Sequence, residues 1–241
     1  MSISIRDSIR WSSDAPSEPT STVVLTSPGH RFVDIRILKD ASTDVAAAAS
    51  GSLDWAFAGP SSSEIRDGGQ RHSTWRHVVD SRTRAPETVV DDGDIFPQED
   101  GRTLETGRMV NPATGKLADY EEVWTDLEAE GVPEVHQNSA ELTQQPRALC
   151  VVLEMEDEER EGRGMVVCVG RHCQGVVRIG DRFAAERWLW EDGGWRRKYR
   201  VGDIWIPNPE TFSSATLSLG EEVGSGEDTV QRWTVVETSH S

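Results

Sequence analysis

Residues 32–38 read Phe-Val-Asp-Ile-Arg-Ile-Leu, and their alternation is the strongest fold signal in the chain. Three apolar side chains fall on one face of an extended segment, whereas Asp34 and Arg36 fall on the other, so the pattern predicts a half-buried β-strand. Residues 22–26 (TVVLT) form a second strand candidate. The turn signal Ser27-Pro28-Gly29 between the two predicts a hairpin.

The rest of the chain repeats this pattern of short apolar or aromatic segments between turn residues. Further strand candidates are residues 53–59, 73–81, 104–110, 119–126, 148–155, 165–171, 174–179, 182–190, 194–201 and 230–238. No segment has the periodicity of a convincing amphipathic helix, and the alanine tract 46–49 is interpreted as a loop or a single turn. Short strands at steady spacing predict an all-β sandwich or barrel.

Composition suggests how the chain divides. Residues 1–21 are rich in Ser, Pro, Thr and Asp, which predicts a flexible tail. The polar segment 131–146 is a linker candidate, so residues 22–130 and 147–241 would each form a β-barrel domain. The acidic segment 91–101 is interpreted as a surface loop and is the competing boundary. We favour the later boundary because each half contains a glycine followed by a strand centred on tryptophan.

Charge and apolar content exclude several classes of function. The chain has 241 residues and a net charge of −17, which disfavours nucleic-acid binding and anionic membrane surfaces. The longest apolar run, residues 148–153, is far too short to cross a bilayer, and the first eleven residues lack the apolar stretch of a secretory signal. Three cysteines are too few for a disulfide framework. We therefore expect a soluble intracellular protein in a reducing compartment.

Several motifs carry a family resemblance. They are Trp55, Phe57 and Gly59 in the first segment, Glu105 and Gly107 in the second, and Gly170, Arg171, Gln174 and Gly175 in the third. In this order and spacing they resemble the Hri-type fungal proteins, a family named for interaction with a yeast casein kinase I. The resemblance implies two small antiparallel lipocalin-like (calycin-type) barrels in tandem, a cytoplasmic and nuclear location, association with a kinase, and no established catalytic activity.

Two groups of residues could suggest a metal or catalytic site. Cys168, His172 and Cys173 resemble a metal cluster, but positions 168 and 173 of a continuous strand would point to opposite faces. His72 and His77 have the same odd spacing, and no nucleophile motif lies beside either. We therefore assign no metal, no cofactor and no catalytic residue.

Two further groups could contact a ligand. Arg196, Lys198 and Arg200 fall on one face of a predicted strand, where they could receive a phosphate or an acidic peptide. Pairing with acidic neighbours on a solvated face is the alternative. Trp188 and Trp190 share a strand face, which suits either a core position or a stacking site for a ligand.

We predict a non-enzymatic interaction protein, a partner of a casein-kinase-I-type kinase. The alternative is a calycin-like barrel that binds a small apolar ligand, with Trp55, Phe57, Trp75 and Trp188 lining a cavity. An enzyme of unknown chemistry is the third possibility. A cavity of about 300 Å³ or more with convergent polar groups would favour a ligand, and a filled interior would favour the interaction role.

The kinase hypothesis also names candidate phosphoacceptors. Casein kinase I enzymes favour a Ser or Thr three residues after an acidic residue, and four such positions lie in segments interpreted as tail or loop. They are Ser21, Thr43, Ser213 and Ser225. An acidic, Ser-rich chain also contains such pairs by chance.

Overall fold

The computed structural model describes residues 1–39, 52–133, 147–212, 217–224 and 231–240, and nearly all of its regular structure is β-strand. The predicted all-β class is confirmed. The first sheet contains β1 (Ser2–Trp11), β2 (Thr20–Thr26), β3 (Arg31–Leu38), β4 (Leu53–Ile65), β5 (Arg71–Trp75), β6 (Val79–Asp80), β7 (Asp92–Pro97), β8 (Thr103–Asn111) and β9 (Lys116–Leu127). The second contains β10 (Leu149–Asp157), β11 (Gly162–Val169), β12 (His172–Ile179), β13 (Arg182–Glu191), β14 (Gly194–Val201), β15 (Glu222–Gly224) and β16 (Arg232–His240). Short helical turns are Pro86–Thr88, Glu158–Arg160 and α2 (Pro209–Phe212).

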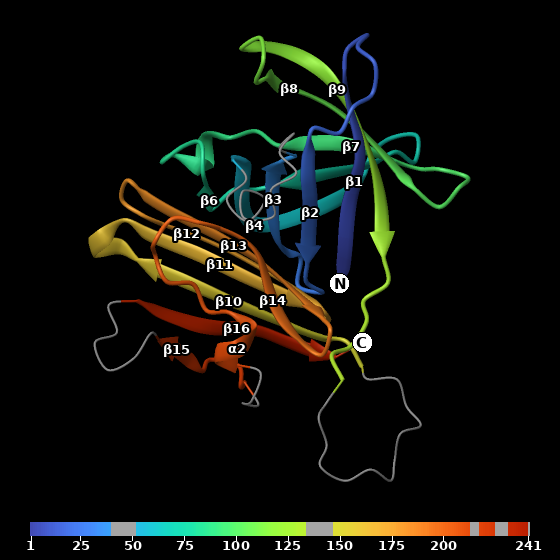
Figure 1. Ribbon diagram of the computed structural model, residues 1–241. Helices are drawn as coiled ribbons and strands as arrows, with labels where there is room; N and C mark the ends of the chain where they lie inside the picture. Colours follow the sequence, from blue (N-terminus) through green and yellow to red (C-terminus); the bar gives the residue numbers. More distant parts are fainter. Residues whose placement is uncertain (40–51, 134–146, 213–216, 225–230, 241) are drawn as a thin grey trace.

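The first sheet closes into a barrel. Its strand order is β3-β2-β1-β9-β8-β7-β5-β4, and β4 pairs back onto β3 from Arg31 opposite Pro60 to Ile37 opposite Leu53. The short β6 attaches to β4 outside this ring. Figure 1 shows the barrel in the upper part of the molecule, with the second sheet below it. A ring of eight strands leaves an interior that side chains can fill or that can hold one small ligand.

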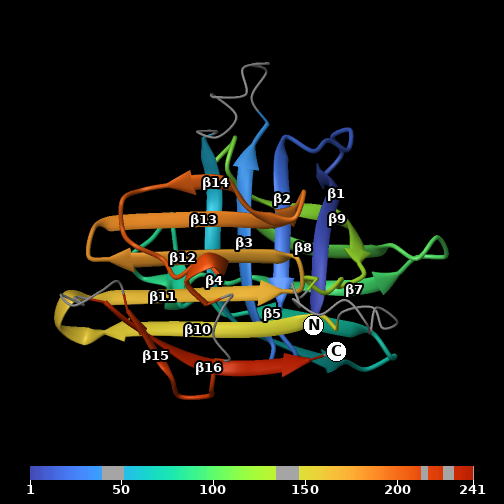
Figure 2. The same ribbon diagram turned by 60° about the horizontal axis from the view of Figure 1, so that its bottom comes forward.

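The second half does not form the second barrel that the sequence predicts. Its seven strands make one sheet in the order β14-β13-β12-β11-β10-β16-β15, and its edge strands β14 and β15 do not pair with each other in the described part of the chain. One face of this sheet packs against the outer wall of the barrel, and Figure 2 shows its strands crossing those of β2, β3 and β4. On the other face, Ile204 and Ile206 from the segment after β14 pack against side chains of the sheet, including Trp233 of β16.

The sequence predicts that β3 is half-buried, but the strand is buried on both faces because the second sheet covers its outer face. Val33 and Ile35 point outward and are fully buried against the second sheet. Asp34 and Arg36 point into the barrel, where their exposed fractions are 2% and 8%. The charged face of the strand was expected to contact water, but it lines the barrel interior.

A polar joint fixes the two sheets together within this apolar contact. The Gln174 side chain donates hydrogen bonds to the carbonyl oxygens of Val23 (2.9 Å) and Val33 (3.1 Å). Its own oxygen accepts from Arg187 Nε at 2.8 Å, and the Arg187 guanidinium also donates to the Ile35 carbonyl at 2.6 Å. Burial lowers the pKa of Arg187 to about 10, which leaves it charged at neutral pH. The family motif residue Gln174 therefore connects β12 to β2 and β3.

Two segments differ from their predicted structure. Residues 1–21, predicted as a flexible tail, contain β1, which lies between β2 and β9 in the barrel. Composition conceals this strand because its polar residues, such as Ser4 and Arg6, face the interior. The predicted surface loop 91–101 contains β7. The alanine tract 46–49 and residues 134–146 of the predicted linker lie outside the described residues. No helix among the described residues has the length and apolar character needed to cross a membrane.

Candidate binding site in the barrel

The barrel encloses a cavity of about 350 Å³, lined by side chains from all eight of its strands. The cavity opens at the end where β1 begins and β9 ends. Ser63 and Arg71 lie near this mouth and are exposed. Asp34, Glu105 and Glu122 line the deeper part and are buried. The interior is therefore neither filled nor purely apolar.

Ion pairs hold the floor of the cavity. The Arg36 guanidinium contacts Asp34 Oδ2 at 2.9 Å and Glu122 Oε1 at 3.3 Å, and Arg6 pairs with the same Glu122 oxygen. Glu18, from the segment after β1, accepts from Arg6 Nε at 2.8 Å and covers this end of the barrel. Burial opposes the charge on Arg36, but the carboxylates of Asp34 and Glu122 outweigh that effect and raise its pKa. These contacts fix the deep wall before any ligand arrives.

A pair of carboxyl groups lies on neighbouring strands of this wall. Glu105 on β8 and Glu122 on β9 are direct cross-strand partners, and both are buried. Tyr120 donates its hydroxyl proton to Glu105 Oε1 at 2.8 Å. Burial, together with the neighbouring charges of Glu122 and Asp91, raises the pKa of Glu105 well above its ordinary value. Glu105 therefore keeps its proton over a wider pH range than a surface glutamate.

His77 connects two further carboxylates behind the aromatic wall. Its Nδ1 lies 2.7 Å from Asp80 Oδ2, and its Nε2 lies 3.0 Å from Asp91 Oδ2. Burial lowers the pKa of His77, but the hydrogen bonds to Asp80 and Asp91 more than offset this and raise it overall. The ring of His77 also stacks on Phe57, with 4.2 Å between centroids. Sequence spacing did not reveal these partners because the turn after β5 brings them together.

Of the four aromatic residues predicted to line a cavity, two do so. Phe57 and Trp75 line it, while Trp55 lies against Phe57 with 4.3 Å between ring centroids and donates to Asp80 at 3.0 Å. Trp188 belongs to the core on the far face of the second sheet, so its predicted lining role is wrong. Trp190 lies on the same β13 strand, against Trp195.

Two further aromatic residues, Phe32 and Trp124, line the cavity and were not among the predicted lining residues. Tyr120, Glu122 and Trp124 are spaced two residues apart in β9 and therefore share one face of the strand. This spacing was the sequence signal that could have placed Trp124 in the interior.

Two buried polar atoms of the lining residues have no hydrogen-bond partner among the residues that the structure describes. They are Asp34 Oδ1 and Trp124 Nε1, an acceptor and a donor, and both residues line the cavity. Burial raises the pKa of Asp34, although the nearby Arg36 opposes the shift. Buried polar groups in folded proteins are nearly always paired. The unpaired atoms mark where a bound molecule could supply contacts that the chain does not.

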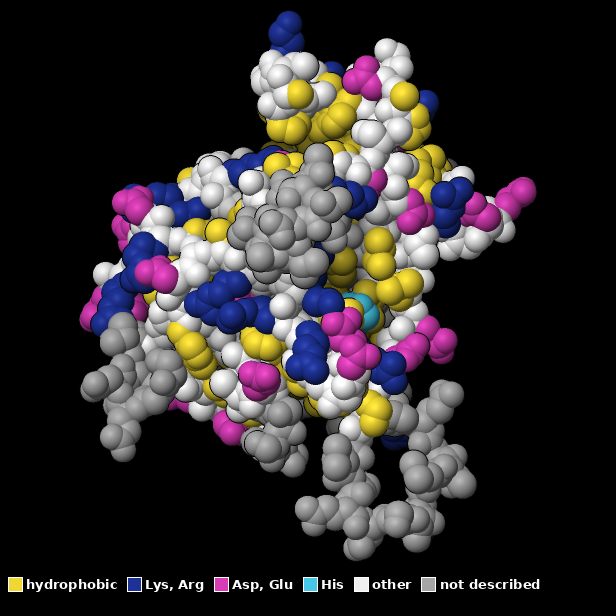
Figure 3. Space-filling view, in the orientation of Figure 1, with side chains coloured by type: hydrophobic (Ala, Val, Ile, Leu, Met, Phe, Trp, Pro, Cys, Tyr) yellow, Lys and Arg dark blue, Asp and Glu magenta, His cyan; other side chains and the backbone are white. Residues whose placement is uncertain are grey.

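The predicted anion-binding face has acidic partners for two of its three residues. Lys198 pairs with Glu191, and Arg200 pairs with the buried Glu186. Arg196 is exposed on β14, and in the strand register it pairs with Leu189 whereas Arg200 pairs with Glu186. The register shift between these pairs places Arg196 and Arg200 on opposite faces of the sheet, so the prediction of a single face is wrong. Figure 3 shows Lys and Arg side chains gathered over β13 and β14. Cross-strand pairing thus accounts for Lys198 and Arg200.

The cysteines are placed differently from the prediction. Cys168 and Cys173 are direct cross-strand partners on β11 and β12 and form a disulfide. The expectation of opposite faces is wrong because Gly170, with a φ of +54°, begins a tight turn that reverses the chain between them. Cys150 is free and buried. Within the described residues, no group of three or more His, Cys, Asp or Glu side chains is arranged to hold a metal ion.

The remaining motif residues have structural contacts. A Cβ on Gly59 would lie 1.9 Å from the Arg76 carbonyl oxygen, and the Tyr120 ring covers Gly107. Arg171 donates to the Gly131 carbonyl oxygen at 3.2 Å. Gly175 lies in β12. These residues shape the barrel wall and the second sheet.

Only one predicted phosphoacceptor can be placed. Ser21 lies in β2, not in a tail, and its Oγ accepts a hydrogen bond from Arg187 at 2.9 Å. Thr43, Ser213 and Ser225 lie outside the described residues.

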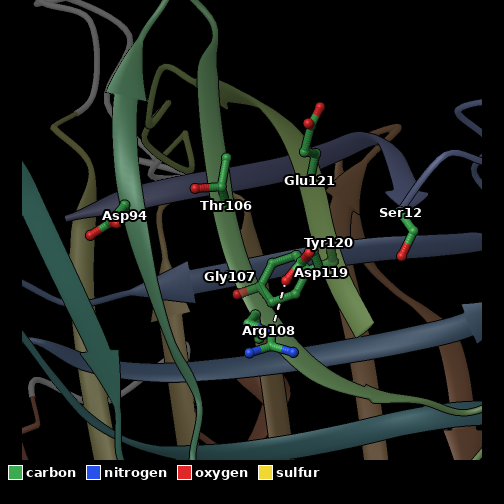
Figure 4. A pocket seen from close by; sticks show the side chains of 8 residues that line it. All are labelled: Ser12, Asp94, Thr106, Gly107, Arg108, Asp119, Tyr120 and Glu121. Carbon is green, nitrogen blue, oxygen red and sulfur yellow. Dashed lines mark ion pairs between the residues drawn. The ribbon is translucent and has the colours of Figure 1, made fainter. Parts of the chain in front are cut away.

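A second hollow of about 330 Å³ lies over β7, β8 and β9 (Figure 4). Arg108 and Asp119 form an ion pair across it at 2.8 Å, and both side chains are more than half exposed. Glu121 pairs with Arg10 at the same surface. Because its charges are solvated and mutually paired, this hollow is a weaker candidate site than the barrel cavity.

The comparison with known families settles the resemblance noted in the sequence. The family model "Protein HRI1" matches residues 2–237. The chain belongs to the HRI1 family. A crystal structure of the uncharacterised protein YLR301w from Saccharomyces cerevisiae has the same fold, with a TM-score of 0.75 and 20% sequence identity over 99% of this chain and 98% of the other. No curated protein sequence matches this chain significantly. The crystal structure of the yeast protein thus has the same fold as this member of the HRI1 family.

Proposed function

We propose that this HRI1-family chain is a small-molecule-binding protein and that the closed barrel holds the ligand. The observation that carries the proposal is the cavity of about 350 Å³, with buried polar side chains converging on it. Ligand sites in proteins begin at about this volume and combine apolar walls with a few placed polar groups. A filled barrel interior would have favoured a purely structural or interaction role.

The cavity wall is also preorganised. Arg6 and Arg36 are fixed by ion pairs to Glu122 and Asp34, and Tyr120 is fixed by its hydrogen bond to Glu105. Side chains that are already held in place lose little conformational freedom when a ligand binds, so less of the interaction energy is spent on ordering them. This arrangement supports binding of one defined molecule.

Association with a casein-kinase-I-type kinase is a separate proposal, which rests on the family resemblance. Of its four candidate acceptors, Ser21 is held in a strand and the other three lie outside the described residues. Incubation with the kinase followed by phosphosite mapping tests that proposal without reference to the barrel.

Native mass spectrometry tests the binding function directly. The purified protein is mixed with a library of small molecules, and bound masses are recorded for the wild type and for two tryptophan variants. Ser63→Trp places a bulky side chain at the mouth of the cavity. Ser62→Trp, at the next position of β4 and outside the cavity lining, is the matched control. We expect bound masses for the wild type and Ser62→Trp that disappear in Ser63→Trp. Equal binding by all three proteins, or by none, would overturn the proposal.

A further inference from the structure

The cavity lining carries more acidic than basic side chains. Its acidic members are Asp34, Asp91, Glu105, Glu122 and Asp126, whereas its basic members are Arg36, Arg71 and the imidazole of His30. Arg71 and His30 are exposed near the mouth. Among the described residues, Arg36 is therefore the one arginine that lines the deep part of the cavity.

Arg36 does not satisfy all of these carboxyl groups. It is shared between Asp34 and Glu122, and Asp34 Oδ1 has no partner within the described part of the chain. Among the contacts found for Glu105, its side chain accepts one neutral hydrogen bond, from the hydroxyl of Tyr120. These carboxyl oxygens can accept hydrogen bonds from a positively charged group of a ligand. Such charge-assisted hydrogen bonds are stronger than neutral ones.

The walls of the cavity suit the rest of such a ligand. Phe32, Phe57, Trp75 and Trp124 line it and present aromatic surface. Arg36 already lies over the Phe57 ring, with its guanidinium carbon 5.3 Å from the centroid. Aromatic rings attract cations at this range and also pack against apolar groups. A ligand with a cationic head and an aromatic or apolar body uses both properties.

We infer that the ligand is a small organic cation, a protonated amine or guanidinium on an aromatic or apolar body, whose charge is held by Asp34, Glu105 and Glu122. This inference rests on the proposed binding function and names its ligand class. An anionic ligand is disfavoured because the carboxyl groups of the lining outnumber its arginines. A neutral polyol would leave the excess of acidic groups without a partner.

Binding of a cation is coupled to the proton on Glu105. The groups that face Glu105 are Glu122 and Tyr120 on β9, Asp91 before β7, and Arg36 on β3. A cation beside Glu105 favours its ionised form, so binding expels a proton to solvent and tightens as the pH rises. Calorimetry in buffers of different ionisation enthalpy measures this proton release.

The test compares three probes of similar shape at pH 7 by calorimetry. They are 2-phenylethylamine, the neutral 2-phenylethanol and the anionic 3-phenylpropanoate. We expect the amine to bind the full-length protein at least tenfold more tightly than the alcohol, and the carboxylate to bind most weakly. Equal affinity for amine and alcohol, or tighter binding of the carboxylate, would overturn the cation inference and leave the binding function standing. If none of the three binds, the cation inference fails, and the native mass spectrometry decides the binding function separately.

Two variants locate the charge. Glu105→Gln keeps the size of the side chain and removes its ability to ionise, so we expect at least a fivefold loss of amine affinity and an unchanged affinity for the alcohol. Glu121→Gln removes one negative charge from the opposite face of the same sheet, and should change neither affinity by more than twofold. A loss that is equal in both variants would show that net charge, not the cavity, attracts the amine. The thermal midpoint of each variant confirms that it is folded.

Discussion

The buried carboxyl of Glu105 makes stability depend on pH in a direction that can be calculated. Its pKa in the folded protein is raised by burial first and then by Glu122 and Asp91. In the unfolded chain the pKa of a glutamate is about 4.3. Between these two pKa values the folded protein binds one more proton than the unfolded chain, so the contribution of Glu105 to stability falls as the pH rises through this window. Below the unfolded-state pKa that contribution is fully present.

Glu105→Gln removes this titration and keeps the shape of the side chain. The free energy of unfolding of the variant, minus that of the wild type, should therefore rise with pH by up to about 1.4 kcal/mol per unit above about pH 4.5. At lower pH, where both side chains are neutral, the two proteins should agree to within about 1 kcal/mol.

Urea unfolding from pH 4 to pH 8, followed by tryptophan fluorescence, measures the difference. Glu121→Gln is the control, because Glu121 points outward on β9 and pairs with Arg10 at the surface. A difference between Glu105→Gln and the wild type that stays constant with pH, or falls, would refute the assignment of a buried, proton-holding Glu105.

Three further predictions concern stability. Trp55→Ala should lower the free energy of unfolding by about 3–5 kcal/mol because it empties a buried aromatic site, and a loss under about 1 kcal/mol in chemical denaturation would contradict this packing. Arg187→Ala should cost about 1–3 kcal/mol because it leaves the buried Gln174 oxygen without its donor and removes the hydrogen bonds to Ser21 and Ile35; an unchanged unfolding midpoint would refute the joint. Reduction of the Cys168–Cys173 disulfide should cost about 2 kcal/mol, as expected for a short closed loop, and should add the mass of two hydrogen atoms in an intact-mass spectrum.

The sequence was a good guide to strands and a poor guide to what each strand faces. Alternation in residues 32–38 located β3 correctly. It could not show that Asp34 and Arg36 face a barrel interior, because a polar face looks the same in the sequence whether it contacts water or an enclosed ion network. The same ambiguity concealed β1, whose polar residues resemble a tail in composition although Ser4 and Arg6 point inward.

The remaining differences between prediction and structure depend on contacts between segments that lie far apart in the sequence or on a turn between strands. The second half has strands of the predicted type, but its edge strands do not meet within the described residues, and sequence alone gives no measure of closure. The cysteine parity argument failed at one residue, since Gly170 turns the chain between Cys168 and Cys173. The cavity depends on the relative depth of Trp55 and Phe57, which share a strand face and differ in their distance from the mouth. Depth is set by neighbouring strands that lie far away in the sequence.

The central claim is that a ligand binds inside the barrel, and the nine tryptophan indoles report on it directly. Trp75 and Trp124 line the cavity, whereas Trp188 and Trp233 lie in the core of the second sheet. A two-dimensional nitrogen–proton spectrum resolves the indole signals, and single Trp→Phe variants assign them. Titration with the three phenyl probes in turn should move the signals of Trp75 and Trp124 and leave those of Trp188 and Trp233 in place. If a probe binds and its shifts are confined to Trp188, Trp233 or other parts of the second sheet, the barrel is not the binding site.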